Sequence, residues 1–525
     1  MPSLVVEGGC ANDQTLGFIR GRPATLGLHR SVSHTHFNGI NWFSSPMIRL
    51  RLHQATRSWQ TWNVRRAHYT VLAIETSCDD TSVAILEYAG CSAKTLFHQT
   101  VTAQSDAHAG IHPLVALQSH RTHLAPLLRK AVISQEANSV DATLQHHAPR
   151  WKPDVIAATR GPGMRNNLSV GLDAAKALAA VWDVPLVGVH HMQAHALTPR
   201  LVTALGKGDP YPASRVELSR NSTRPAFPFL TVLVSGGHTM LLSSTSLTGH
   251  ATLAETQDIA VGDCLDKAAR TILPPSCLRS PYGAALERFA FRDAVETSGR
   301  SRIDPDEIIA ASHYSYDPPA RRQDEMTRRP TKWAWSIAPP LADSKAGEKS
   351  PNRMVYSFAG LLSIVERYMM HEIDTHGSLT TRKRDPEHIT LAERRDMARE
   401  VQRIAFEHIA SRIMLYLSAS KWTGDTVVVS GGVASNKFLR HVLRSILDIR
   451  GYGYVKLEFP PVELCTDNAL MIAWAAVEMV EAGHTNDFSI LPLRKWSMDP
   501  DALDGGILGV GGYTMDDGAA LVTNG

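Results

Sequence analysis

Several features that would assign a class of protein are missing from this chain of 525 residues. Apolar residues never run for the roughly 18 positions that a transmembrane helix needs, so no membrane span is predicted. The six cysteines are scattered and form no C-x-x-C pair, which argues against a disulfide framework or a zinc ribbon and favours a reducing compartment. Neither G-x-x-x-x-G-K-[ST] nor G-x-G-x-x-G occurs, so no P-loop or Rossmann dinucleotide site is indicated.

Acidic residues are missing from the front of the chain. There is no Asp or Glu from Gln14 to Ile74, whereas residues 1–66 contain eight Arg against two acids, a charge of +6. Because the whole chain carries +3, the remainder carries −3. An Arg-rich, acid-poor N-terminus with Ser is typical of a mitochondrial presequence, so we predict the mitochondrial matrix. The alternative for residues 1–66 is a disordered basic tail with no targeting role, and residues 1–46 are an extension or a misassigned start if Met47 is the true initiator.

Hydrophobic patterning predicts an α/β fold. Residues 69–75 form an apolar, β-branched run that ends in a polar turn, and 82–86 are expected to complete a hairpin. A strand at 155–158, a helix at 168–181 and a strand at 185–189 follow in the order of a βαβ unit. Further helices are expected at the following ranges: 110–135, 354–372 and 389–421.

A strand followed by Ser-Gly-Gly occurs twice, at 229–238 and at 425–433. We take this repetition as a sign of a second lobe built on related turn chemistry. Glycine lets several backbone N–H groups approach an anion, so both turns are candidate phosphate sites, although most Gly-Gly turns are only tight turns. The expected division is a presequence (1–66), a first lobe (67–228), a second lobe (229–498) with an insertion or partly disordered loop (293–350), and a flexible tail (499–525).

His191 and His195 are four residues apart, which on a helix places both imidazoles on one face, close enough to share a metal ion. A bare pair of this kind is more often structural, and a third ligand is needed. Asp467 precedes a long apolar helix, and its spacing favours a helix cap over a ligand. A zincin protease is not predicted, because Met192 occupies the position of the required Glu.

Three carboxylates lie within residues 258–267. Asp263 is a candidate cap for a helix over 265–272, and Asp266 is a candidate acceptor for a ligand hydroxyl; the plainer interpretation is a charged helix N-terminus favoured by the helix dipole. Since residues 67–525 carry −3, contact with a nucleic acid would need a local basic patch rather than the overall charge.

Six motifs together carry a resemblance to one family. They are Ile74–Ala84 (IETSCDDTSVA), Thr159–Gly163 (TRGPG), Gly188–His195 (GVHHMQAH), Leu233–Thr239 (LVSGGHT), Ser430–Arg440 (SGGVASNKFLR) and Cys465–Ala473 (CTDNALMIA). With these motifs the chain resembles the tRNA N6-adenosine threonylcarbamoyltransferase family (TsaD/Kae-type), mitochondrial branch, over roughly residues 69–292 and 354–496.

The resemblance implies the two-lobed actin-like ATPase fold of Hsp70 and the sugar kinases, with a central nucleotide cleft. It implies one divalent metal ion per subunit, of zinc or iron type, held by His191, His195 and Asp467. Glu75 is expected to face the cleft and help to position the substrate, and no catalytic residue is assigned. The residues implied to contact the substrate nucleotide are Leu233, Val234, Ser235, Gly236, Gly237, Asp266, Gly283 and Asn436.

The implied reaction transfers the threonylcarbamoyl group from threonylcarbamoyl-AMP to N6 of adenine 37 in mitochondrial tRNAs that read codons beginning with A. The implied partners are tRNA and a second copy of the chain. Three alternatives stay open. The first is a metal-dependent glycoprotein endopeptidase, which the Met at 192 argues against, and the second is a non-enzymatic ATP-binding scaffold, which the intact set of His191, His195 and Asp467 argues against. The third is a sugar kinase or chaperone ATPase of the same fold, which ATP turnover without tRNA would favour.

Overall fold

The computed structural model describes residues 68–104, 112–139, 151–206, 223–291, 314–342, 352–374, 378–420 and 422–515. The predicted presequence, residues 1–66, lies outside this part of the chain. No helix of the described residues is both long and apolar enough to cross a membrane.

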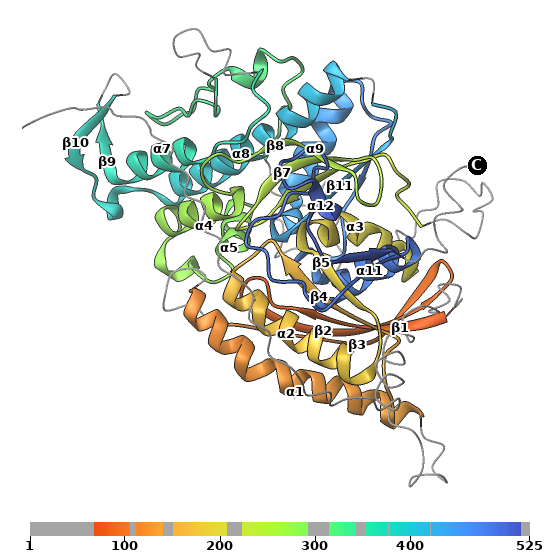
Figure 1. Ribbon diagram of the computed structural model, residues 1–525. Helices are drawn as coiled ribbons and strands as arrows, with labels where there is room; N and C mark the ends of the chain where they lie inside the picture. The colour runs from red at the N-terminus through yellow and green to blue at the C-terminus, as the bar shows by residue number, and fades with distance from the viewer. Residues whose placement is uncertain are drawn as a thin grey trace, which may run out of the picture. The chain divides into compact units, whose positions relative to one another are not determined.

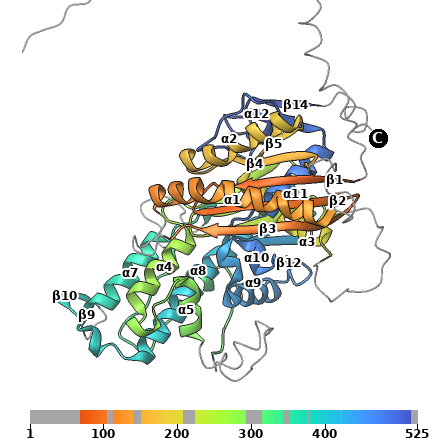
Figure 2. The same ribbon diagram turned by 90° about the horizontal axis from the view of Figure 1, so that it is seen from below.

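A seven-stranded mixed sheet forms the first half of the fold (Figures 1 and 2). Its strands, in spatial order, are β14 (Tyr513–Met515), β13 (His484–Asn486), β5 (Leu186–His190), β4 (Val155–Gly161), β1 (His68–Glu75), β2 (Asp80–Ala89) and β3 (Ser92–Thr102). Strands β1 and β2 form the predicted antiparallel hairpin, whereas β1, β4 and β5 are parallel neighbours. The predicted βαβ unit is therefore confirmed.

Helices cover both faces of this sheet. Alternate residues of β1 point to opposite faces, and each set packs against a different pair of helices. Val71 and Ala73 pack in one apolar cluster with α3 (His191–Ala204) and α11 (Ala469–Glu481). Leu72 and Ile74 pack in another cluster with α1 (Pro113–Ser139) and α2 (Arg165–Trp182). Figure 1 shows α1 and α2 on one side of the sheet and α3 and α11 on the other.

A second, five-stranded sheet has the order β12 (Lys456–Glu458), β11 (Thr426–Ser430), β6 (Phe229–Val234), β7 (Thr239–Ser244) and β8 (His250–Glu255). Strands β6 and β11 are parallel neighbours, with Val427 opposite Leu230 and Ser430 opposite Leu233. The two strand-Ser-Gly-Gly units thus lie side by side in one sheet. Both units fall within residues 229–498, the range expected for the second lobe.

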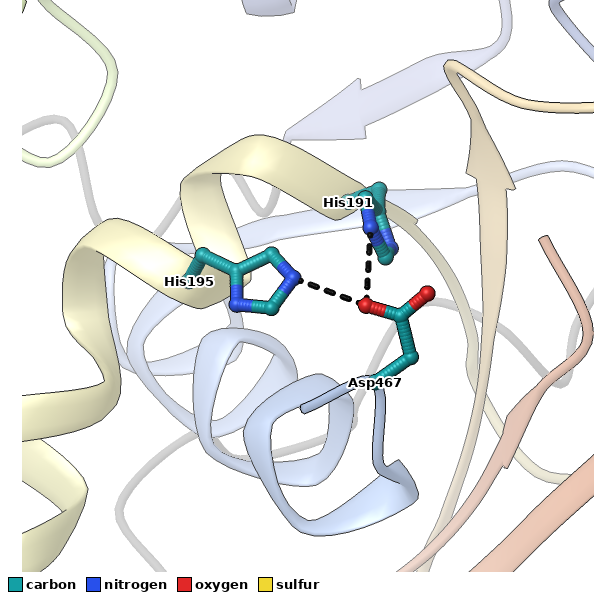
Figure 3. Close-up of side chains that lie close together, drawn as sticks. All are labelled: His191, His195 and Asp467. Atoms are coloured by element: carbon teal, nitrogen blue, oxygen red, sulfur yellow. Dashed lines mark hydrogen bonds and ion pairs between the residues drawn. The ribbon is translucent and has the colours of Figure 1, made fainter. Parts of the chain in front are cut away.

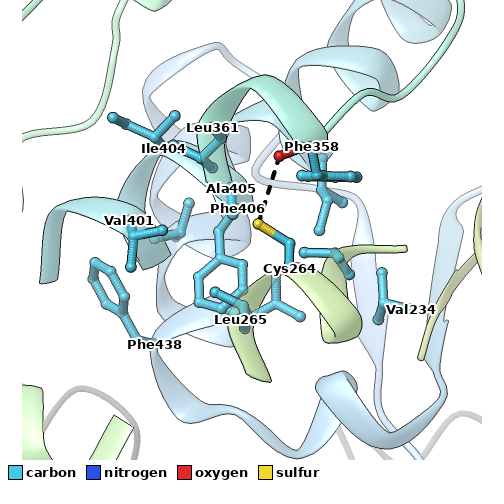
Figure 4. Packing of buried hydrophobic residues seen from close by; sticks show 14 of the residues in the cluster. Val234, Cys264, Leu265, Phe358, Leu361, Val401, Ile404, Ala405, Phe406 and Phe438 are labelled. Carbon is cyan, nitrogen blue, oxygen red and sulfur yellow. Dashed lines mark hydrogen bonds between the residues drawn. The ribbon is translucent and has the colours of Figure 1, made fainter. Parts of the chain in front are cut away.

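Five helices cover one face of the second sheet: α4 (Val261–Ile272), α5 (Tyr282–Ala290), α7 (Ala359–Met370), α8 (Leu391–Ala419) and α9 (Lys437–Ile449). Cys264 lies in the middle of this packing, where its Sγ is 3.7 Å from the carbonyl oxygen of Phe358 (Figure 4). The other face, through Phe229 and Leu233 of β6 and Val428 of β11, shares an apolar cluster with α3 and α11. These two helices therefore lie between the sheets.

The remaining elements are short. They are β9 (His371–Ile373), β10 (Leu379–Lys383), α10 (Val462–Cys465), α12 (Gly506–Gly509) and the 3-10 turns η2 (Pro275–Cys277), η4 (Asp324–Met326), η6 (Pro386–His388) and η7 (Gly432–Ser435). Taken together, the two helix-covered sheets confirm the predicted α/β class and are consistent with the two-lobed arrangement.

The described part of the predicted insertion, residues 314–342, packs onto α8. Trp335 is only 2% exposed, and its Nε1 donates to Oε1 of Glu393 at 3.0 Å. Trp333 Nε1 donates to Oδ2 of Asp396 at 2.9 Å. Aromatic side chains with paired N–H groups anchor this segment to the second sheet's helices, so its described part has a fixed position.

The chain returns to the first sheet near its end. Helix α11 packs on β1, and β13 joins β5 through Asn486 and Leu186. The predicted second lobe, 229–498, is therefore wrong from α11 onward, and the predicted flexible tail is wrong for 499–515, where Ile507 is buried and β14 pairs with β13. Strands of three residues carry too little pattern to be predicted. Residues 516–525 lie outside the described part.

Candidate metal centre and phosphate loops

Helix α3 begins directly after β5 and carries both candidate histidines. His191 is its first residue and His195 follows one turn later, so the two imidazoles point to the same side. Both side chains are buried, and their ring centroids are 4.7 Å apart. His190, the residue before the helix, accepts hydrogen bonds from the N–H groups of Met192 and Gln193 and so fixes where α3 begins.

Asp467 lies in the turn between α10 and α11 and faces these histidines (Figure 3). Its Oδ1 is 3.0 Å from Nε2 of His195 and 3.4 Å from Nε2 of His191. The cap of α11 is Asn468, whose Oδ1 accepts from the N–H of Met471 at 3.0 Å. The interpretation of Asp467 as a helix cap, which its spacing favours, is therefore wrong.

The three side chains fit a divalent metal ion. Their ligand atoms all lie within 4.8 Å of one another. Ligands at about 2.0–2.2 Å from one metal ion are roughly 3–3.5 Å apart, and the distances of 3.0 and 3.4 Å from Asp467 Oδ1 to the two imidazoles match this. Two imidazole nitrogens and one carboxylate oxygen suit zinc or iron, and three protein ligands leave room for a substrate or water.

Glu75 lies at the Nδ1 side of the His191 ring, away from the Nε2 that faces Asp467. The Glu75 side chain is fully buried, with Oε2 3.3 Å from Nδ1 of His191. It also accepts from the N–H of Ser77 and the hydroxyl of Thr159. A carboxylate at Nδ1 places the ring hydrogen there and leaves the Nε2 lone pair for a metal. The expectation that Glu75 faces the cleft is wrong, and its position suits orienting a ligand.

His191, Asp467 and Glu75 shift one another's pKa values through their charges. Burial alone would lower the pKa of His191, but the nearby charges of Asp467 and Glu75 outweigh it and raise that pKa to about 10. Burial would raise the pKa of Asp467, yet His191 and His195 hold it well below its usual value. In the same way His191 outweighs burial and lowers the pKa of Glu75. Without a metal, His191 is therefore an imidazolium between two carboxylates, and a bound cation would displace its proton.

The first candidate phosphate loop, residues 235–238, joins β6 to β7. Leu233 and Val234 precede it, but their side chains are buried in apolar clusters, so only their backbone can face a ligand. Ser235 Oγ accepts from the N–H groups of Gly237 and His238 at 3.3 and 3.0 Å. A side chain added to Gly236 or Gly237 would meet no atom within 4 Å, so the loop borders open space.

The second loop and helix α4 adjoin the first loop. Gly431 has φ +100°, and a side chain there would lie 2.4 Å from the carbonyl oxygen of Val234. A side chain on Gly262, in the first turn of α4, would lie 2.6 Å from the carbonyl oxygen of Ser235. The N-terminus of α4 therefore abuts the first loop, to which the N–H of Gly262 donates through the carbonyl oxygen of Ser235 at 3.1 Å.

The remaining predicted contacts have internal partners. Asp266 Oδ1 accepts from the N–H of Gly283 at 2.7 Å, so these two residues are brought together. Asn436 caps α9 by accepting from the N–H of Leu439, and its amide donates to Gln402. Asp263 is no cap: α4 already begins at Val261, and Asp263 pairs with Lys267.

Sequence reasoning missed the residues that support the metal ligands. These residues are His190, which caps α3, and Ser77 and Thr159, which donate hydrogen bonds to the carboxylate of Glu75. The one available signal was the adjacency of His190 to the pair. Hydrogen bonds between segments far apart in the chain leave no periodic trace in the sequence.

A family model described as tRNA N6-adenosine threonylcarbamoyltransferase (TsaD) matches residues 95–302 and 294–474. Mitochondrial tRNA N6-adenosine threonylcarbamoyltransferase from Schizosaccharomyces pombe is 32% identical over 460 residues, which cover 84% of this chain and 91% of the relative.

Two further relatives have related names. The mitochondrial protein of the same description from Rattus norvegicus is 28% identical over 79% of this chain and 82% of its own. A tRNA N6-adenosine threonylcarbamoyltransferase from Gluconobacter oxydans is 32% identical over 82% of this chain and 93% of its own. Among solved structures, HypF from T. kodakarensis matches 78% of this chain and 48% of its own at 13% identity, but its TM-score of 0.36 is too low to inform the fold.

Proposed function

This chain belongs to the tRNA N6-adenosine threonylcarbamoyltransferase family, and on that premise we propose that it transfers a threonylcarbamoyl group to N6 of adenosine in mitochondrial tRNA. The donor is threonylcarbamoyl-AMP, and the acceptor is adenine 37 of tRNAs that read codons beginning with A. The observation that carries the proposal is the convergence of His191, His195 and Asp467 from two distant segments onto one buried point.

These three residues hold the divalent ion of the enzyme, of zinc or iron type. When bound there, such an ion supplies Lewis-acid polarisation and a template for the oxygen atoms of the donor. Glu75 keeps the hydrogen of His191 on Nδ1, which directs Nε2 toward the ion. The chain thereby presents a preformed set of donor atoms on the packed helix α3.

The glycine loops bind the AMP part of the donor. The exposed backbone at Gly236 and Gly237, which carries no side chain, leaves room for the phosphate beside the first turn of α4. Asp266 and Gly283, joined by a hydrogen bond, and Asn436 lie on the neighbouring helices α4, α5 and α9 and are assigned to the adenosine. Binding the leaving group in this way fixes the donor relative to α3.

Positioning supplies much of the rate. The exocyclic amine of adenine is a poor nucleophile, and holding it beside the bound donor replaces an encounter between two separate molecules. No described side chain is assigned as a general base. Because residues 67–525 carry −3, the tRNA contacts a local basic surface rather than the overall field.

The working location is the mitochondrion, in keeping with the names of two relatives, and we assign the enzyme to the matrix as a homodimer. The endopeptidase alternative is not favoured. Met192, which stands where a zincin has its general base, is an apolar side chain that is only 4% exposed.

Mass spectrometry of mitochondrial tRNA nucleosides tests the function. We expect a strain that lacks this chain to lose threonylcarbamoyladenosine from its mitochondrial tRNA, and the full-length chain to restore it. A normal level of the modified nucleoside in the deletion strain would refute the assignment. ATP turnover by the purified chain in the absence of tRNA would instead favour a kinase or chaperone.

A further inference from the structure

His190 sits at the junction between β5 and the helix that carries both histidine ligands. Its ring is 1% exposed, and Nδ1 lies 3.2 Å from the backbone nitrogen of Met192 and 3.4 Å from that of Gln193. Both nitrogens belong to the first turn of α3, where backbone N–H groups have no partner within the helix. Ser, Thr, Asp and Asn usually accept these hydrogens, and here an imidazole does so.

The surroundings of the ring allow one protonation form. Nδ1 faces two N–H donors, so it must carry a lone pair. Nε2 lies 3.1 Å from the carbonyl oxygen of Trp496, so it must carry the hydrogen and donate it. The ring is therefore neutral, with both nitrogens in use. No nitrogen of His190 is left for a metal ion, which distinguishes it from His191 and His195.

The segment that receives this hydrogen bond is itself anchored. The rings of His190 and Trp496 are in contact at 4.5 Å between centroids, and Trp496 Nε1 donates to the carbonyl oxygen of Gly506 at 3.1 Å. Arg160 lies over the Trp496 ring and donates to the carbonyl oxygens of Leu491 and Gly511. The C-terminal segment 491–511 is thus fastened to the ends of β4 and β5.

We propose that His190 is a positioning residue of the metal centre, which caps α3 through Nδ1 and ties its first turn to the C-terminal segment through Nε2. His191 belongs to that first turn, and His195 follows one turn later. A frayed or rotated first turn would move His191 away from Asp467. The C-terminal segment, through Trp496, which lies 306 residues after His190, therefore helps to position the metal ligands His191 and His195.

The inference rests on the proposed metal site but not on the proposed reaction, so its test measures metal binding. Co²⁺ is titrated into the metal-free full-length chain, and the visible absorption of the bound ion is followed. His190→Phe keeps the ring volume and loses both hydrogen bonds, whereas His190→Asn keeps a cap acceptor. His408→Phe is the matched control, because His408 is also buried and accepts a backbone N–H, from Ser357, in the other sheet's helices.

We expect His190→Phe to weaken Co²⁺ binding by about 10- to 100-fold, as for other outer partners of metal ligands. The asparagine variant should lose less than about tenfold, an effect between those of wild type and His190→Phe, since Asn is a good cap but cannot make the hydrogen bond to Trp496. The control should bind Co²⁺ like the wild-type chain. Thermal unfolding of each metal-free variant shows whether it is folded.

Two results would overturn the proposal. One is wild-type Co²⁺ affinity in a folded His190→Phe chain. The other is an asparagine variant that is folded but binds Co²⁺ as weakly as the phenylalanine variant, which would show that the cap does not matter. If His190→Phe does not fold, the asparagine variant decides alone, with a loss above about tenfold counting against the proposal. Loss of tRNA modification with normal Co²⁺ binding would count against the proposed function instead.

Discussion

The metal centre and the glycine loops are built in opposite ways. The centre consists of buried or half-buried polar side chains that hold one another: Glu75 against His191, and both histidines against Asp467. The loops consist of exposed backbone beside open space, and the strands before them pack their side chains in the core. The side chains of the metal centre hold one another in position without a ligand, whereas the loops provide open space that a ligand can occupy. Substitutions in the centre should therefore weaken metal binding, and substitutions in the loops should weaken donor binding.

Removing a ligand from the centre should have the largest effect. We expect His195→Ala to abolish threonylcarbamoyladenosine in mitochondrial tRNA and to lower metal affinity by more than about 100-fold, since losing even an outer partner costs 10- to 100-fold. The fold should persist, which circular dichroism checks. His388→Ala, at an exposed histidine in η6, is the control. A normal nucleoside level in a strain carrying only His195→Ala would remove this residue from the site.

Weakening the support of a ligand should have the next largest effect. Glu75→Gln keeps the shape of a side chain but removes the charge beside Nδ1 of His191. We expect metal affinity to fall by about 10- to 100-fold, measured by competition with a chelator. Glu393→Gln, another buried carboxylate in hydrogen-bond contact, controls for the loss of a buried charge. Equal metal affinities in both variants would mean that Glu75 does not orient His191.

A side chain added to the first glycine loop should weaken donor binding and leave metal binding unchanged. Gly236→Ala places a methyl group in open space, so stability should change by less than about 0.5 kcal/mol. The KM for threonylcarbamoyl-AMP should rise about tenfold, which corresponds to about 1.4 kcal/mol of lost binding. Gly262→Ala is the contrasting variant, because its methyl group would lie 2.6 Å from a carbonyl oxygen and should cost about 1–3 kcal/mol of stability. An unchanged KM in Gly236→Ala would separate this loop from the donor.

A change remote from both sites should leave the chemistry nearly untouched. Trp335→Ala removes a buried anchor of residues 314–342 and should lower the free energy of unfolding by about 3–5 kcal/mol. Metal affinity should stay within about twofold of wild type, because Trp335 contacts α8 and not α3. Denaturant unfolding and a metal titration measure both quantities. A large loss of metal affinity would show that the two halves of the fold are coupled.

The sequence predicts the local elements well and the long-range pairings poorly. Residues 69–75 and 82–86 predict the β1–β2 hairpin because apolar, β-branched runs and a polar turn are local signals. Asp467 shows the limit. Its spacing suggests a helix cap, but the cap is its neighbour Asn468, which frees the Asp467 carboxylate for histidines more than 270 residues earlier.

The division of the chain into lobes also depends on long-range pairings that the sequence does not show. Nothing local marks β13 as the neighbour of β5, since a strand of three residues has almost no alternation to read. Glu75 likewise reads as a polar residue at a strand end, and only its contacts with His191 and Thr159 reveal a buried support. Family resemblance supplies the ligand set but not the residues that hold it.

The most direct test of the account asks whether the three-residue centre holds a metal ion that the transfer requires. Metal content and transfer of threonylcarbamoyl to tRNA are measured on the purified full-length chain and on Asp467→Asn, before chelation, after chelation and after re-addition of the metal. We predict one divalent ion per wild-type chain, loss of transfer on chelation and recovery on re-addition, with neither binding nor recovery in Asp467→Asn. A metal-free wild-type chain that transfers at the full rate would contradict it.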